Sequence, residues 1–301
     1  MQRGLSLLLG VLLDRLVGDP SWGHPIRLIG LLGKAAFRVL APLQAWGGLL
    51  TLLFCGGLFG ALVWISVKAL PWLEPLWLFY LIALTSLERE VGRVFKALEK
   101  EGLSAARERL RFLVSRQVEL LDKEGIVRGA LETLAENFND AFCGPLFWYV
   151  VGGLPAAALY KVVETLDSMF GYPYEPYRAF GWPIARADDL LNLVPARLAA
   201  IFLALAAPFC RGSFFETLRV ALRDAPAHSS PNAGWPEAAL AGALKISLGG
   251  PIPYPQGLKK WPWFGEGFRT PTPEDFPRAL RLVRVAALEA LGIALLLTLI
   301  Y

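Results

Sequence analysis

"WGGLLTLLFCGGLFGALVWISV", residues 46–67, decides the fold class, because it contains no charged side chain. A helix needs roughly 20 mostly apolar residues to cross the hydrocarbon core of a bilayer. The next stretch, "PWLEPLWLFYLIALTSL" (residues 71–87), is almost as apolar, so the two predict a transmembrane helical hairpin over 46–87. Because 55% of the 301 residues are hydrophobic, we expect an all-α polytopic integral membrane protein.

Three further apolar segments raise the expected total to about 4–5 membrane-embedded helices in a single integral membrane domain. They cover residues 142–163, 193–209 and 285–301. Gly152, Gly153 and Pro155 interrupt the first, and it carries Lys161, which predicts a broken or re-entrant helix. Residues 88–141 predict amphipathic helices that include a cytosolic helical pair, and 211–284 predict polar loops around one short helix at 236–248.

The distribution of charge indicates orientation. Lys and Arg are frequent on both sides of the hairpin, which places both flanks in the cytoplasm. We therefore expect a multi-pass protein of the cell membrane whose active site, within the polar stretches of 142–209, faces the cytoplasm. A net charge of +4 confined to loops argues against nucleic acid as a partner. The start of the chain lacks the pattern of a cleavable signal peptide, and the three cysteines lack metal-type spacing.

A row of acidic side chains ends where the apolar segment at residue 142 begins. Glu132, Glu136 and Asp140 follow Arg128 at intervals of four residues, so a helix would carry all three carboxylates along one edge. An ordinary solvated helix face is one interpretation. The other is a cation site, because unpaired charge beside lipid is expensive.

A second acidic group lies in "RADDLLNLVPAR". Asp188, Asp189 and Asn192 would fall within a helical sector of about 100°, flanked by Arg186 and Arg197. Oxygen ligands on one face suit Mg²⁺ that is shared with phosphate oxygens. The alternative is an aspartate cap at the start of a transmembrane helix.

Lysine and hydroxyl groups come together in "LYKVVETLDSMFGY". Asp167 and Ser168 follow Lys161, which would pair with a phosphate or a carboxylate, or extend its amine to the membrane surface.

The chain has two histidines, His24 and His228. Ser229, Ser230 and Asn232 follow the second histidine and lead into an expected helix start. Their hydroxyls and the backbone N–H groups there either bind a phosphate or form an ordinary helix cap.

Four stretches together resemble the CbiB/CobD family of cobalamin biosynthesis, the adenosylcobinamide-phosphate synthases. They are "DRLVGDPSWGHPIRLIG", "LRFLVSRQVELLDKEGIVRGALETLAENFNDAFCGPLFWY", "LYKVVETLDSMFGYPYEPYRAFGWPIARADDLLNLVPARL" and "HSSPNAGWPEAALAGALKISLGG", in order from residue 14 to 250. The chain departs from the family at Gln117, Val118, Ala141 and Glu164, where Asp, Thr, Gly and Asn are usual.

The resemblance implies a membrane enzyme that uses ATP and Mg²⁺ to join a propionate carboxyl of adenosylcobyric acid, a corrinoid, to (R)-1-amino-2-propanol or its phosphate. It also implies a homo-oligomer or an association with other cobalamin-assembly enzymes. A membrane transferase acting on a phosphate-linked lipid, and a non-catalytic sensor or transport component, are the alternatives.

Three expected groups of site residues follow from the motifs and the resemblance. The catalytic residues are His228, His24, Lys161, Arg116 and Asp167; those that bind substrate or phosphate are Arg27, Arg186, Arg197, Asn137, Ser168, Ser229, Ser230 and Asn232; the metal ligands are Glu132, Glu136, Asp140, Asp188, Asp189 and Asn192.

Overall fold

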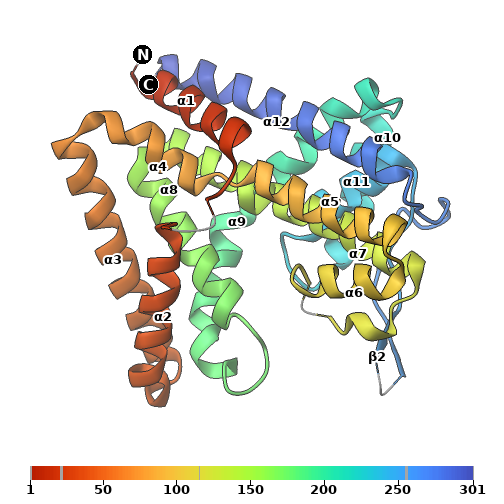
Figure 1. The fold of residues 1–301 in the computed structure, drawn as a ribbon, viewed down its shortest axis with the longest axis horizontal. Helices are drawn as coiled ribbons and strands as arrows, with labels where there is room; N and C mark the ends of the chain where they lie inside the picture. The colour runs from red at the N-terminus through yellow and green to blue at the C-terminus, as the bar shows by residue number, and fades with distance from the viewer. Residues whose placement is uncertain (1, 21–22, 115, 255–256, 301) are drawn as a thin grey trace. The chain divides into compact units, whose positions relative to one another are not determined.

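The computed structural model describes residues 2–20, 23–114, 116–254 and 257–300, and it divides into two compact units. Unit 1 comprises residues 1–85, 140–193 and 291–301, and unit 2 comprises 86–139 and 194–290. Helices dominate both units, and the strands in the described residues are two or three residues long (Figure 1). The expected all-α class is confirmed.

Unit 1 is a bundle of long apolar helices. Helix α3 packs against α2 and α8, and α1 packs against α4 (Figure 1). The elements are α1 (Gln2–Val17), α2 (Ile26–Leu40), η1 (Ala41–Leu43), α3 (Ala45–Ala69), η2 (Pro71–Leu73), α4 (Glu74–Leu81), α8 (Gly144–Phe170), the first part of α9 (Arg178–Ala206) and the end of α12 (Asp275–Ile300). Short 3-10 turns that contain prolines connect α2 to α3 and α3 to α4.

The second arm of the expected hairpin is shorter than the apolar stretch suggested, because α4 ends at Leu81. The Ala83 N–H bonds to the Ala141 carbonyl at 3.0 Å instead of continuing the helix. Asp14, which is 1% exposed, accepts hydrogen bonds from the Thr85 N–H at 3.1 Å and the Thr85 hydroxyl at 2.9 Å. A new helix, α5, therefore starts at Leu84 with the Asp14 carboxylate at its N-terminal end.

The expected break in the segment that starts at residue 142 is confirmed. Within α8, Gly152 and Gly153 leave helical geometry, and Gly153 has φ of +68°. Pro155 follows two residues later, where it has no N–H to contribute. Lys161 and the expected site residues around it therefore lie on the second half of a kinked helix.

Unit 2 consists of amphipathic helices around the short α11, which is apolar except for Glu237. Helix α11 packs against α10 and α7, and α6 packs against α7. The elements are α5 (Leu84–Lys100), α6 (Leu103–Arg111), η3 (Val118–Leu120), α7 (Lys123–Phe138), η5 (Ala207–Cys210), α10 (Phe214–Asp224), η6 (Ala225–Ala227), α11 (Gly234–Leu244), β1 (Leu248–Gly249), β2 (Ile252–Tyr254), β3 (Gly257–Lys259) and β4 (Trp263–Phe264). Strand β1 pairs antiparallel with β4, and β2 pairs with β3.

Four helical segments among the described residues are long and apolar enough to cross a membrane. They are Ala45–Ala69, Lys123–Phe170, Arg178–Cys210 and Asp275–Ile300. The second joins α7 to α8 through a π-helical turn, Asn139–Cys143. With four spans, the chain is a polytopic membrane protein, in agreement with the expected number.

Candidate functional site

In unit 2, Glu132 of α7 is fully engaged by two partners. Asp122 caps α7 by accepting from the Gly125 N–H at 2.8 Å, and the apolar stripe of the helix buries Glu132 to 3% exposure. Its Oε2 accepts from Arg116 Nη2 at 2.7 Å, and its Oε1 accepts from the Gly249 N–H at 2.7 Å. Glu132 therefore joins the loop before α7 to strand β1, and it raises the pKa of Arg116.

Glycine at position 249 is required for this contact. Gly249 has φ of +70°, a conformation that L side chains rarely adopt, and a Cβ there would lie 2.2 Å from the Pro262 carbonyl oxygen. Because the backbones of Gly249 and Pro262 approach closely, the Gly249 N–H can reach the buried Glu132 carboxylate.

Glu237 is a buried carboxylate outside the three expected groups of site residues. It lies in the first turn of α11, is 4% exposed, and interacts electrostatically with Glu132, Glu136 and Arg116. Burial, with repulsion from the two glutamates, raises the pKa of Glu237 well above its usual value. The available signal was a single charge in "GWPEAALAGAL", an otherwise apolar helix.

His228 lies beside this group, directly after the turn η6. Its Nδ1 is 2.9 Å from the Ser230 backbone nitrogen and 3.2 Å from the Ser230 carbonyl oxygen, so Nδ1 has a partner in either neutral tautomer. The ring packs edge-on against Trp261, with centroids 5.3 Å apart. Burial lowers the pKa of His228, which keeps the imidazole neutral at pH 7.

The expected phosphate-binding residues around Asn232 are partly committed to the protein. The Ser230 hydroxyl accepts from the Asn232 and Ala233 N–H groups at 3.2 and 3.3 Å, which is the capping interpretation of this stretch. Arg197 lies over the Trp235 ring at 4.6 Å and contacts Asn232 Oδ1 at 3.5 Å. A stacked guanidinium beside an amide presents N–H donors to an anionic or amide ligand.

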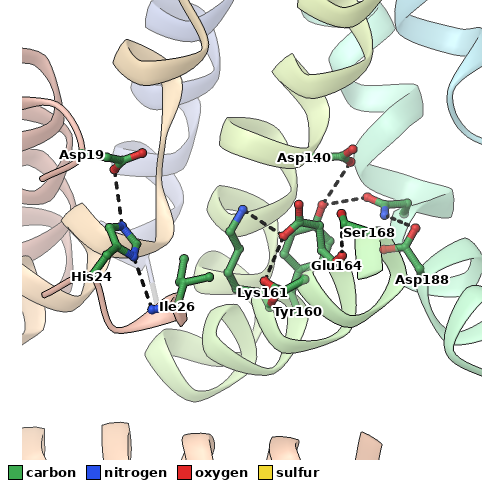
Figure 2. A network of polar contacts seen from close by, with 11 residues as sticks. Asp19, His24, Ile26, Asp140, Tyr160, Lys161, Glu164, Ser168 and Asp188 are labelled. Carbon is green, nitrogen blue, oxygen red and sulfur yellow. Dashed lines mark hydrogen bonds and ion pairs between the residues drawn. The ribbon is translucent and has the colours of Figure 1, made fainter. Parts of the chain in front are cut away.

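In unit 1, a pocket of about 550 Å³ brings together residues from two of the four motif stretches, the first and the third. Figure 2 shows Asp19 and His24 at one side of the view and Lys161, Glu164 and Ser168 on α8. His24 Nε2 is 3.6 Å from Asp19 Oδ1, and its Nδ1 accepts from the Ile26 N–H at 3.3 Å. Lys161, only 7% exposed, pairs with Glu164 at 3.0 Å. The pocket lining also includes Arg27, Tyr80 and Thr165.

A buried series of hydrogen-bonded side chains, called here the polar chain, connects α8 and α9 in the same unit; its members are Asp140, Tyr160, Asp188 and Asn192. The Tyr160 hydroxyl is 2.9 Å from Asn192 Oδ1 and 3.5 Å from Asp140 Oδ1, and Asn192 Nδ2 donates to Asp188 Oδ2 at 3.0 Å (Figure 2). Glu164 interacts electrostatically with both Tyr160 and Asp188. Two of the expected acidic groups thus meet here, because Asp140 joins Asp188 and Asn192.

The acidic row expected along α7 ends at Glu136. The π-helical turn begins at Asn139, so Asp140 no longer follows the four-residue spacing and belongs to unit 1. A single wide turn shifts every later side chain around the helix axis.

Asp189 has a different partner from Asp188. It pairs with exposed Arg186 at 2.9 Å, whereas its neighbour Asp188 bonds to Asn192. The cap alternative for this pair does not hold, because α9 starts at Arg178, well before both aspartates.

Two other expected residues form local hydrogen bonds. The Asn137 amide donates to the Thr133 carbonyl at 3.1 Å, and the Ser168 hydroxyl donates to the Glu164 carbonyl at 3.0 Å. Ser229 is exposed. These contacts leave their roles toward a substrate as predictions.

The fit of a divalent cation differs between the two acidic groups. Asp140, Asp188 and Asn192 offer hard oxygen donors in an apolar bundle, which suits Mg²⁺. Among the described residues, however, no three His, Cys, Asp or Glu side chains are grouped so that they could hold a metal ion by themselves. Phosphate oxygens and water would have to supply the remaining ligands. Glu132 does not fit, because both of its oxygens are occupied.

The fold and the site define a class: an all-α polytopic membrane protein that keeps ionisable and amide side chains inside its helical units. Within that class, the chain belongs to the CobD/CbiB protein family, whose profile matches residues 7–283.

Similar relatives cover nearly the whole chain. Cobalamin biosynthesis protein CobD of Citrobacter koseri is 38% identical, covering 96% of this chain and 95% of the relative. Cobalamin biosynthesis protein CobD of Rhodobacter capsulatus is 42% identical, covering 88% and 86%. Cobalamin biosynthesis protein CbiB of Salmonella paratyphi B is 38% identical, covering 96% and 95%. No solved structure matches the chain.

Proposed function

We propose that this protein is an enzyme of cobalamin biosynthesis that forms an amide between a propionate carboxyl of adenosylcobyric acid and (R)-1-amino-2-propanol or its phosphate, with ATP as the energy source. The observation that carries the proposal is near-full-length similarity to proteins named for cobalamin biosynthesis, at 38–42% identity. The product would be adenosylcobinamide or its phosphate, and the active site would face the cytoplasm of a cell-membrane protein.

The chemistry requires activation of the carboxyl. A carboxylate does not condense with an amine at neutral pH, because its oxygen is a poor leaving group, and transfer of a phosphoryl or adenylyl group from ATP provides a better one. Bound Mg²⁺ would neutralise charge on the ATP phosphates, with Asp140, Asp188 and Asn192 as its proposed ligands in unit 1.

Cationic groups have the complementary role. Lys161 and Arg27 line the pocket of unit 1 and would compensate negative charge on a phosphate. Arg197, stacked on Trp235, would orient a polar side chain of the corrinoid. Arg116 would act through Glu132, which it holds in place.

His228 is the better of the two histidines for removing the ammonium proton. His24 has both ring nitrogens engaged, Nδ1 by the Ile26 N–H and Nε2 by Asp19. In His228, Nδ1 contacts both the backbone nitrogen and the carbonyl oxygen of Ser230. Its Nε2 can therefore lose or gain a proton while Nδ1 keeps a hydrogen-bond partner.

The test is turnover by the purified full-length protein in detergent or nanodiscs. ATP, Mg²⁺, adenosylcobyric acid and the amine are supplied, and corrinoid products are identified by mass spectrometry while nucleotide is quantified. We expect amide product and ATP consumption that depends on adenosylcobyric acid. Consumption that needs a lipid acceptor instead would support a lipid transferase, and no ATP consumption would support a non-catalytic component; either outcome contradicts the proposal.

A further inference from the structure

We propose that unit 1 binds the phosphate headgroup of an anionic phospholipid in a small cavity lined by α1, α3, α4 and α8. This cavity, called here the headgroup cavity, shares no residue with the pocket that contains His24 and Lys161. The inference therefore goes beyond the amide reaction and does not depend on it.

The headgroup cavity is small, and two basic side chains line it from different helices. Its volume is about 210 Å³, below the roughly 300–1,000 Å³ of pockets that enclose a whole small ligand. Arg3 comes from α1, and its Nη2 would lie 3.4 Å from a Cβ placed on Gly153, so the guanidinium lies against the kink of α8. Lys68 comes from α3, and its Nζ lies 4.7 Å from the centroid of the Trp64 ring. The space thus suits one anionic headgroup rather than a corrinoid.

Within the described part of the chain, the basic groups of the cavity have no acidic partner. Glu74 also belongs to the lining, but the Ser6 hydroxyl donates to its Oε2 at 2.9 Å and the Tyr149 hydroxyl lies 2.9 Å from its Oε1. Neither Arg3 nor Lys68 forms an ion pair with Glu74 or with any other described acidic side chain. Two cations and one carboxylate leave an excess of positive charge, which an anion would compensate.

The position of the cavity in the chain indicates where this anion comes from. Lys68 is in the last turn of α3, which is one of the four candidate membrane spans. Trp64 lies one turn before it, and Trp72, in the short turn after α3, is 68% exposed. Tryptophan and lysine at the end of a span are typical of the depth at which lipid headgroups lie. Lipid phosphates are therefore the anions that surround this end of α3.

The rest of the lining favours a lipid over free phosphate. Val63, Val67 and Leu154 are apolar parts of the cavity wall. They would cover the glycerol and the first methylene groups of a lipid, which removes apolar surface from water. The guanidinium of Arg3 can form paired hydrogen bonds to phosphate oxygens, and Lys68 adds a point charge. Inorganic phosphate would use the two cations but not the apolar wall.

The inference is tested by native mass spectrometry of the purified full-length protein in an uncharged detergent. The protein is titrated with dioleoylphosphatidylglycerol, and wild type should bind it more tightly than dioleoylphosphatidylcholine, whose headgroup has no net charge. Arg3→Gln and Lys68→Gln should each weaken phosphatidylglycerol binding about fivefold, the contribution of one basic residue at a membrane surface. Arg38→Gln is the matched control, because it removes an exposed cation from α2 outside the cavity, and it should bind as wild type does.

Thermal unfolding of the same samples shows that the variants are folded. Without added lipid, both cavity variants should unfold close to the wild-type temperature, because Arg3 and Lys68 are exposed. Phosphatidylglycerol should then stabilise wild type more than either variant.

Three results would overturn the inference. The first is equal affinity of wild type for the two lipids. The second is a loss of affinity in Arg38→Gln as large as that in Arg3→Gln, since general attraction between basic residues and anionic lipid would then explain the binding. The third concerns inorganic phosphate as a separate probe: if it stabilises wild type as much as phosphatidylglycerol does and displaces that lipid, the ligand is free phosphate and the lipid assignment falls.

Discussion

Neighbouring carboxylates in this protein have different surroundings, and the surroundings separate their roles. Asp188 bonds to Asn192 inside the polar chain of unit 1, whereas Asp189 pairs with exposed Arg186. Glu132 is held by two donors, whereas Glu237 has none among the described residues. The position of each carboxyl relative to its donors, rather than its residue type, indicates which groups are available to a ligand.

Substitution of adjacent aspartates should therefore have unequal effects on activity. Asp188→Asn should lower kcat/KM for amide formation by about 100-fold or more, as expected when a group that stabilises charge in the reaction is lost. Asp189→Asn should change it by less than about threefold, because exposed ion pairs contribute little. Steady-state assays on both membrane-inserted variants provide the measurement, and an equal loss in both would contradict the assignment.

His228 should determine the acid side of the pH–rate profile. Burial lowers its pKa below the usual 6.5, so the base form persists to more acidic pH than an ordinary histidine allows. As pH decreases, kcat/KM should therefore begin to decline only below pH 6.5. His228→Asn should lose this acid limb of the profile and should lose much of the rate. His24→Asn is the matched control, because these are the two histidines of the chain, and it should keep the acid limb.

The same shift has a consequence for stability with a defined sign. Because the folded-state pKa of His228 is depressed, the unfolded chain binds more protons once pH falls below about 6.5. The contribution of neutral His228 to stability is therefore present above that pH and is lost as pH decreases through the folded pKa. Unfolding of His228→Asn should be less sensitive to acid than that of wild type; equal acid sensitivity would argue against a buried neutral ring.

At the scale of elements, the contact between β1 and α7 organises unit 2. The antiparallel pairing of β1 with β4 brings Gly249 to Glu132, and the left-handed conformation of this glycine lets the two backbones approach closely. The strands are only two residues long, so their importance lies in this placement rather than in sheet hydrogen bonding.

A methyl group at position 249 should disrupt this contact. Gly249→Ala adds backbone strain and a clash at 2.2 Å with the Pro262 oxygen, and we expect a loss of stability greater than the roughly 1–3 kcal/mol typical of backbone strain alone. Gly267→Ala isolates the strain, because Gly267 has φ of +86° and nothing within 4 Å of its added Cβ. Chemical unfolding in detergent should give Gly249→Ala a lower free energy of unfolding than Gly267→Ala. The reverse order would contradict the role given to Gly249.

At the scale of the whole molecule, four apolar spans determine where the protein resides. In helix α3, as in Asp275–Ile300, the most apolar window is only 33% buried inside the protein, and the remaining surface is available to lipid. Exposed apolar side chains along it, such as Leu58 and Trp64, are expected where hydrocarbon replaces water.

A charge in the middle of α3 should therefore impair membrane insertion. Leu58→Arg, at a position 46% exposed, should cost about 2.5–3.5 kcal/mol of insertion energy. We expect less protein in the membrane fraction, measured by fractionation and immunoblotting. Leu222→Arg is the control, since Leu222 is 57% exposed on α10, which is not among the four spans; equal loss of both proteins would argue against α3 as a lipid-facing span.

Much of the fold was predictable from sequence because it depends on local composition. A charge-free apolar run commits the chain to a helix in lipid, where every backbone polar group needs an internal partner. Two glycines and a nearby proline likewise predicted the break in α8, since neither residue type supports a continuous helix. The end of α4 was not predictable, because it depends on Asp14 and Ala141, which are distant in the chain.

The sequence by itself determined the class, the family and the residue types that surround the candidate site, because these depend on composition and on motifs read in order. Only the tertiary structure decided how those residues are grouped: Asp140 with Asp188, Glu132 with Arg116, and Glu237 as a member of the second group. The physical reason is that one π-helical turn, one left-handed glycine and the packing of α11 against α7 set the direction of each side chain. Contacts between residues far apart in the chain leave no local pattern from which they can be read.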